Sequence, residues 1–167
     1  NETIIYGGSD GFFYIKISES FPYFGENIEY IKGERFIIPY FIGLISKILN
    51  IEIFLIFIFF VFIVSIYFIY LIIKNFKSLN LNFNTTIISF SLIIFNPYLL
   101  RYFFAVPTML GDFIFIISTL IIVDGLLKDN KKNIFFGFLL SIITRQNGLF
   151  LFLSFLIAKL IFRNKSI

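Results

Sequence analysis

The residues best suited to chemistry in this sequence are one aspartate near its start and three arginines spread along it. Asp10 stands in the stretch "GGSDG", directly before the aromatic residues of "FFYIK". A carboxylate in such a place can take a proton from a hydroxyl group or hold a divalent cation. It can equally be a turn residue, because aspartate in a glycine-rich loop often bonds its own backbone. From the residues alone, both interpretations stay open.

The arginines Arg35, Arg101 and Arg145 each allow two interpretations as well. A guanidinium binds phosphate through two parallel hydrogen bonds, so these side chains suit an anionic lipid phosphate. A basic residue at the end of a membrane helix also commonly reaches toward lipid headgroups without further function. Asp112 is placed about one turn into an expected helix. It is either a favourable charge at the helix N-terminus or a functional acid at membrane depth.

The composition indicates the solvent that surrounds these residues. The chain is 59% hydrophobic and 14% charged, whereas a soluble domain is about 45–50% apolar and about 25% charged. We therefore expect the lipid bilayer to be the solvent. The chain has no cysteine and no histidine, so acid–base or metal chemistry falls to Asp and Glu. The cofactor stays open, with Mg²⁺ or Mn²⁺ as candidates. No nucleic-acid partner is expected, because the lysines gather in short loops between apolar runs.

The apolar runs predict an all-α membrane protein, a polytopic helical bundle whose external first loop bears short juxtamembrane helices. Residues 1–35 form an extracytoplasmic loop with an interfacial helix at 12–18, and residues 36–167 form the transmembrane helical bundle. Five membrane passes at most are expected, and we expect the chain to be a piece of a longer protein with at least one helix before Asn1. The apolar runs of the bundle are 36–49 (too short to cross), 53–73, 86–107 (bent by its prolines), 108–127, 134–144 and 148–162.

The basic residues of the connections predict the orientation of these helices. The positive-inside rule places their clusters in the cytoplasm; these are Lys74 and Lys77, Lys128, Lys131 and Lys132, and Arg163 and Lys165. The opposite face then holds residues 1–35, residues 96–107 and the break at 145–148. This places the candidate residues together on the outer face of a bacterial plasma membrane, with an extracytoplasmic active site. Those residues are Asp10, Arg35, Arg101, Asp112 and Arg145.

Three stretches resemble the GT-C class of integral-membrane glycosyltransferases, which use polyprenyl-phosphate-linked sugars and include mannosyltransferase-like families. "GGSDGFFYIKISES" resembles their first external loop, "GERFIIPYFIGLISKI" the Arg-x-hydrophobic-x-Pro entry into the next helix, and "IITRQNGLFLF" an Arg-x-x-Gly turn. The resemblance implies that Asp10 is the catalytic base or metal-binding group, and that Arg35 and Arg145 lie near the donor phosphate. Many relatives carry a second acid beside the first. Here the neighbours of Asp10 are Ser9 and Gly11, which leaves Asp112 as the candidate second acid.

The implied activity is an inverting transfer of a sugar from a polyprenyl-phosphate donor to an acceptor that the sequence does not identify. Asp10 would help to deprotonate the acceptor hydroxyl, and the three arginines would stabilise the leaving phosphate. Tyr14 and Asn147 are candidates for sugar or lipid contact, and membrane lipids are expected partners. We expect these 167 residues to have no transfer activity by themselves.

Two other classes fit the same outer residues. One is a transporter or flippase-like module for a lipid-linked or anionic solute, which needs no catalytic carboxylate. The other is a non-catalytic scaffold subunit, in which the outer charged residues affect assembly only.

Overall fold

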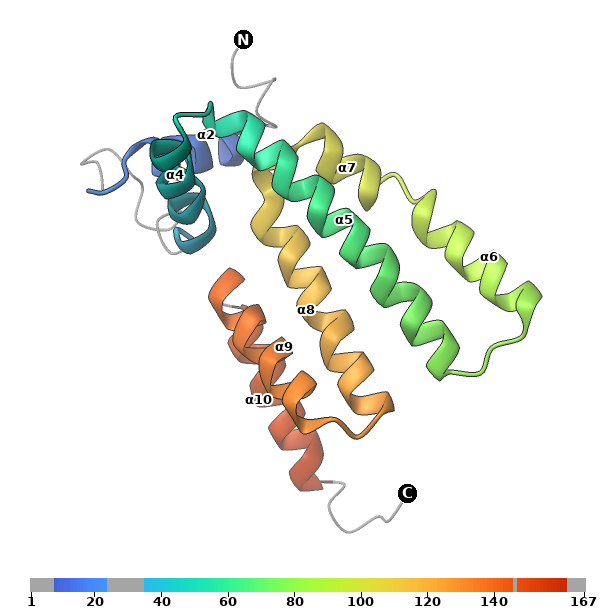
Figure 1. Cartoon of the computed structure of the whole chain (residues 1–167). Helices are drawn as coiled ribbons and strands as arrows, with labels where there is room; N and C mark the ends of the chain where they lie inside the picture. The colour runs from blue at the N-terminus through green and yellow to red at the C-terminus, as the bar shows by residue number, and fades with distance from the viewer. Residues whose placement is uncertain (1–7, 24–34, 146, 162–167) are drawn as a thin grey trace.

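In the part of the chain that the structure describes, all regular secondary structure is helical. The computed structural model describes residues 8–23, 35–145 and 147–161. These residues form eight α-helices and one 3₁₀ turn, without a strand, which confirms the all-α prediction (Figure 1). The elements are α2 (Gly8–Glu19), α4 (Ile37–Leu49), α5 (Ile53–Ser78), α6 (Phe83–Ile94), α7 (Leu100–Ala105), η1 (Pro107–Met109), α8 (Leu110–Leu127), α9 (Lys131–Thr144) and α10 (Asn147–Ile161).

Two helices are long and apolar enough to cross a membrane. The first is α5, with 26 residues and a mean hydropathy of 3.0. The second is η1 together with α8, which gives 21 residues with a mean hydropathy of 2.1. At 1.5 Å per residue, both reach the ~30 Å of a bilayer's hydrocarbon core. The helices α4 and α6 and the described part of α10 are apolar but shorter.

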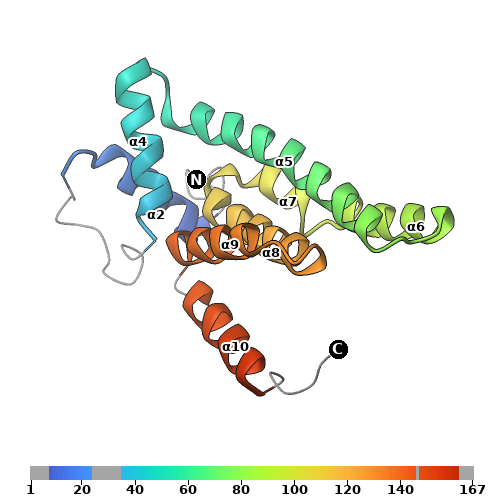
Figure 2. The same ribbon diagram turned by 60° about the horizontal axis from the view of Figure 1, so that its bottom comes forward.

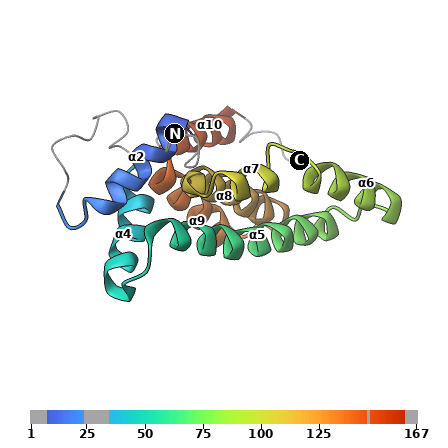
Figure 3. The same cartoon turned by 90° about the horizontal axis from the view of Figure 1, so that it is seen from above.

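The core forms where α5 and α8 run side by side (Figure 3). The ring of Phe113 on α8 meets Phe68 of α5 edge-on at 5.4 Å and stacks on Phe103 of α7 at 4.4 Å. One stripe of α5 faces this centre, because its buried residues recur every three or four positions as a helix face requires. They include Phe57, Val61, Ser65, Phe68, Ile72 and Asn75.

The helices α8 and α9 form the most extensive helix pair, and their backbones approach closely at Gly137. A Cβ atom at Gly137 would lie 2.9 Å from the carbonyl oxygen of Ser118 and 2.6 Å from Cγ1 of Ile122. Small residues at such contacts are typical of helix packing in membranes. A short turn with Asp129 in the left-handed conformation (φ 49°) joins the two helices. After it, α10 follows α9 and points away from the other helices in Figure 2.

The prediction of a loop around Asp10 is wrong. The helix α2 begins at Gly8 rather than at residue 12, so Asp10 lies in its first helical turn. A negative charge there is favourable with the helix dipole, and the glycines before it do not prevent the helix from starting. The buried face of α2 packs on α4, where a Cβ atom on Gly43 would lie 2.1 Å from the carbonyl oxygen of Ser18. The described part of the first polar segment is therefore packed against the bundle.

The remaining breaks fall where the sequence places them. Residues 95–99, which contain Pro97, separate α6 from α7, so the bend predicted before Arg101 is confirmed. The chain leaves helical geometry at Arg145 (φ −150°, ψ 140°), which confirms the break between the two short C-terminal runs. In Figure 1 the C-terminal end of α9 and the N-terminal end of α8 lie toward α2 and α4, whereas the gap between α6 and α7 lies beside α5, farther from α2 and α4.

Candidate functional site

An ion pair between Asp112 and Arg145 joins the first turn of α8 to the end of α9. Nε of Arg145 lies 2.7 Å from Oδ1 of Asp112, and Nη2 donates a 3.0 Å hydrogen bond to Oδ2. The Nε–H group points off the line to Oδ1, so only the Nη2 contact has hydrogen-bond geometry. The side chains are 27% (Arg145) and 25% (Asp112) exposed. The pair is therefore close but open to solvent on one side.

A hydrogen bond between Arg35 and Tyr14 joins the residues just before α4 to the middle of α2. Nη1 of Arg35 donates to the Tyr14 hydroxyl at 3.3 Å, which is long for such a bond, and Tyr14 is buried. Burial alone would lower the pKa of Arg35. The bond to Tyr14 and the charges of Asp112 and Asp10 outweigh this effect, so the pKa is raised above its ordinary value. Arg35 is thus a permanent cation within electrostatic range of both carboxylates.

A small pocket lies between these groups. Its walls come from α2, the start of α4, η1 with the start of α8, and the end of α9; the lining residues are Tyr14, Arg35, Ile38, Pro39, Thr108, Gly111, Asp112 and Thr144. Its interior volume is about 10 Å³, which is room for one water molecule. Larger hollows lie along α6 and between α4 and α5, but apolar side chains make up most of their walls. We call Asp10, Tyr14, Arg35, Asp112 and Arg145 together the acid–arginine site.

The structure brings some of the predicted residues together and leaves others apart. Asp10 is one helical turn before Tyr14 on α2, and its charge acts on Arg35. Arg101 is exposed on α7 and is not among the described residues that line the pocket. Asn147 is the exposed first residue of α10 and does not line the described pocket either. Arg101 and Asn147 are therefore not part of the described pocket wall.

The sequence interpretation missed two threonines and one tyrosine of this region. Thr108 and Thr144 are buried and line the pocket. Each is close in sequence to a predicted residue, since Thr108 is one turn before Asp112 and Thr144 directly precedes the arginine of the break. Tyr102, on α7, lies within electrostatic range of Asp10 and Asp112. The sequence signal that could have identified these residues is their closeness along the chain to the charged candidates.

The carboxylates of the site do not form a metal-binding cluster. Among the described residues, no three Asp, Glu, His or Cys side chains gather closely enough to hold an ion. Asp112 is also engaged by a guanidinium, which competes with a cation for the same oxygens. The described residues of this site therefore do not fit a Mg²⁺ or Mn²⁺ ion.

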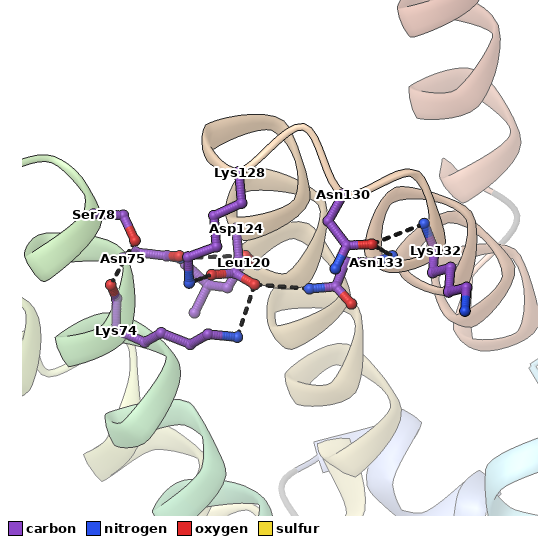
Figure 4. A network of polar contacts seen from close by, with 9 residues as sticks. All are labelled: Lys74, Asn75, Ser78, Leu120, Asp124, Lys128, Asn130, Lys132 and Asn133. Atoms are coloured by element: carbon purple, nitrogen blue, oxygen red, sulfur yellow. Dashed lines mark hydrogen bonds and ion pairs between the residues drawn. The ribbon is translucent and has the colours of Figure 1, made fainter.

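A second polar cluster lies at the opposite end of α8, and the sequence interpretation assigned it no role. The side chain of Asp124 is only 1% exposed. Its carboxylate oxygens accept hydrogen bonds from Nζ of Lys74 at 2.8 Å, Nζ of Lys128 at 2.5 Å and Nδ2 of Asn133 at 2.8 Å (Figure 4). Next to it, Asn75 donates a 3.2 Å hydrogen bond to the carbonyl oxygen of Leu120. We call Asp124, Lys74, Lys128 and Asn133 the lysine network. It connects α5, α8 and α9.

Comparison of the chain with protein-family models, curated proteins and solved structures found no match.

Proposed function

We propose that this chain belongs to an integral-membrane glycosyltransferase that moves a sugar from a polyprenyl-phosphate donor to an acceptor on the extracytoplasmic face. The observation that carries the proposal is the acid–arginine site. Two carboxylates and two arginines from α2, α8 and the ends next to α4 and α9 meet at one end of apolar helices. The short stretches that resemble GT-C enzymes supply the reaction type.

Placement in a membrane is supported by what covers the two long helices. Only 39% of the most apolar window of α5 is buried, and 44% of that of α8. A helix in the core of a soluble protein would be mostly covered, because exposed apolar surface is costly in water. On α5 the uncovered side chains Phe59, Phe62 and Ile66, each more than half exposed, follow one stripe opposite the buried one. Lipid chains suit such a stripe.

The two ends of the bundle carry different charged groups, as the proposed orientation in the membrane requires. The acid–arginine site is at the N-terminal end of α8, and the lysine network is at its C-terminal end. Asp112 and Asp124 are twelve residues apart, or ~18 Å along the helix axis. The lysines mark the cytoplasmic end under the positive-inside rule. The acid–arginine site then faces the other side, where a lipid-linked sugar donor and its acceptor would meet.

In the proposed reaction, each charged residue of the site has a role. Asp10 accepts the proton of the acceptor hydroxyl as its oxygen attacks the anomeric carbon. The bond from that carbon to the phosphate oxygen breaks, and the phosphate keeps the electron pair. Arg35 neutralises the charge that develops there, because Tyr14 takes one of its N–H donors and no second hydrogen bond joins Arg35 to a described residue. Asp112 is the second acid at the site, and Arg145 holds it in place.

Donor binding requires the pocket to widen, since ligand pockets commonly measure about 300–1,000 Å³. The ion pair between Asp112 and Arg145 forms the part of the site that can open most directly, because both side chains are partly exposed. Its separation would release the guanidinium of Arg145 toward the phosphate. In this account, the arginine of the break contributes to donor binding only in the open state.

The test is sugar transfer from a polyprenyl-phosphate-mannose donor, measured in membranes of cells that express the complete gene. Asp10→Asn is expected to lower transfer by about 10²-fold or more with donor binding retained, as for loss of a general base. Arg35→Gln is expected to weaken donor binding instead. Asp129→Asn is the matched control. It makes the same chemical change at the opposite end, in a left-handed turn that asparagine also adopts.

Undiminished transfer in Asp10→Asn at matched expression would overturn the proposal. If transfer is absent in the wild type as well, while a lipid-linked solute crosses the membrane independently of Asp10, the transporter class is correct. If neither activity depends on Asp10 or Arg35 and only assembly changes, the scaffold class is correct.

A further inference from the structure

The end of the bundle that holds the lysine network carries more positive charge than the acidic residues there neutralise. Five lysines lie at this end, which are Lys74, Lys77, Lys128, Lys131 and Lys132. The described acids there are Asp124 and Asp129, so the net charge of these residues is 5 − 2 = +3. The lysine network accounts for two of the cations, because Lys74 and Lys128 both bind the buried carboxylate of Asp124.

The other three lysines face outward. Lys77 is exposed one turn after Lys74 on α5, and Lys131 and Lys132 are exposed at the start of α9. None of the three has an ion pair with a described residue. In Figure 4 the side chain of Lys132 points away from Asp124. The surface therefore combines charges from two separate helices at one end of the molecule.

Helix stability does not account for the two lysines of α9. The N-terminal end of a helix dipole is positive, so cations in the first turn are unfavourable. The side chain of Asn130 already caps this turn by accepting from the backbone N–H groups of Lys132 and Asn133. An external anion next to the three exposed lysines would turn an unfavourable local charge into a favourable one.

We propose that Lys77, Lys131 and Lys132 form a docking surface for the headgroups of anionic phospholipids in the facing leaflet. These lysines stand where the apolar lengths of α5 and α8 end, which is the depth of the lipid phosphates when both helices cross the bilayer. Juxtamembrane basic residues attract anionic lipids by about 1 kcal/mol each. The inference rests on the membrane placement in the proposed function and is independent of sugar transfer.

The test is lipid binding by the chain in nanodiscs or detergent, with phosphatidylglycerol as the probe and phosphatidylcholine as the neutral reference. The double variant Lys131→Gln/Lys132→Gln is expected to lower the preference for phosphatidylglycerol by about tenfold or more, given the attraction per basic residue. The matched control Lys16→Gln/Lys47→Gln removes two lysines from α2 and α4, at the other end. It is expected to keep the preference within about twofold.

Two further measurements make the result decisive. In the wild type, raising the salt concentration must weaken the preference, because exposed charges are screened. Millimolar inorganic phosphate must leave it unchanged, since a lipid surface offers many phosphates at once. An unchanged preference in Lys131→Gln/Lys132→Gln, an equal loss in the control pair, or displacement of the lipid by inorganic phosphate would each overturn the proposal. Because transfer plays no part in the assay, its outcome is independent of the reaction at the acid–arginine site.

Discussion

The two ends of α8 each carry one aspartate, and the structure holds these two residues in different ways. Asp112 is one-quarter exposed, and among the described residues its one ion pair is with Arg145. Asp124 is almost fully buried and is bound by two lysines and one asparagine. Both residues are within about one turn of a helix end, so their positions in the sequence look equivalent. Burial and the number of donors distinguish them.

This difference separates a structural acid from one that is available for chemistry. A buried carboxylate with three donors has little capacity left for a ligand, and moving it would leave charges without partners. A partly exposed pair can open and close at modest cost, because water replaces the lost contact. We therefore infer that the lysine network serves helix assembly, and we propose ligand binding for the acid–arginine site. Three predictions test this division, each by the free energy of unfolding in detergent.

The largest effect is expected where α8 and α9 touch, because this contact brings both aspartates to their partners. In Gly137→Ala, the added methyl group meets the backbone oxygen of Ser118 at 2.9 Å, so the helices must separate. We expect a destabilisation of up to about 3 kcal/mol, the upper end for overpacking. Both ends would be affected, since Arg145 and Asn133 are both attached to α9.

The control for this variant is Gly111→Ala. Gly111 is also on α8, but a Cβ atom there has no described neighbour within 4 Å. Alanine should therefore leave stability unchanged or raise it slightly, because glycine is the poorer helix former. Equal destabilisation by the two variants would show that helix separation is not the cause.

The next effect is expected at the lysine network. Asp124→Asn keeps the shape of the side chain but leaves two lysines facing an uncharged amide. Removing one partner of a fully buried ion pair costs about 3–5 kcal/mol. Lys74 and Lys128 are about one-third exposed, at 32% and 38%, so water recovers part of that cost. We expect about 2 kcal/mol, and less than about 0.5 kcal/mol for the exposed control Asp129→Asn. Similar losses in the two variants would contradict the structural assignment of Asp124.

The sequence predicted the helices well because their signals are local. Apolar length identified α5 and α8, and prolines and the "RQNG" stretch identified the breaks. The one clear error, at Asp10, arose because the glycines of "GGSDG" suggested a turn. In the structure, the residues after them continue a helix whose buried face packs on α4, and this tertiary contact is not visible in a short window of sequence.

The candidate site was predictable in outline only. The distribution of lysines predicted that Asp10, Arg35, Arg101, Asp112 and Arg145 would share one end of the bundle. Contacts and charges link Asp10, Arg35, Asp112 and Arg145 to one another, whereas Arg101 is exposed on α7 and does not line the described pocket. The sequence did not predict which charges pair, because Asp112 and Arg145 are 33 residues apart and meet only through the packing of α8 on α9. For the same reason it did not predict the lysine network, whose members Lys74 and Asp124 are 50 residues apart.

The smallest effect, and the sharpest test of the comparison, is the coupling energy between Asp112 and Arg145. A double-mutant cycle with Asp112→Asn and Arg145→Gln measures it without the other effects of each change. We expect about 1 kcal/mol, the upper end for solvent-exposed pairs, because the guanidinium meets both carboxylate oxygens. A parallel cycle with Lys74→Gln and Asp124→Asn should give a larger value, because Asp124 is buried. If the two couplings are equal, Asp112 is held as firmly as Asp124. The ion pair at the acid–arginine site would then only stabilise helix packing, as the lysine network does. The pocket of about 10 Å³ would have no evident way to open for a sugar donor.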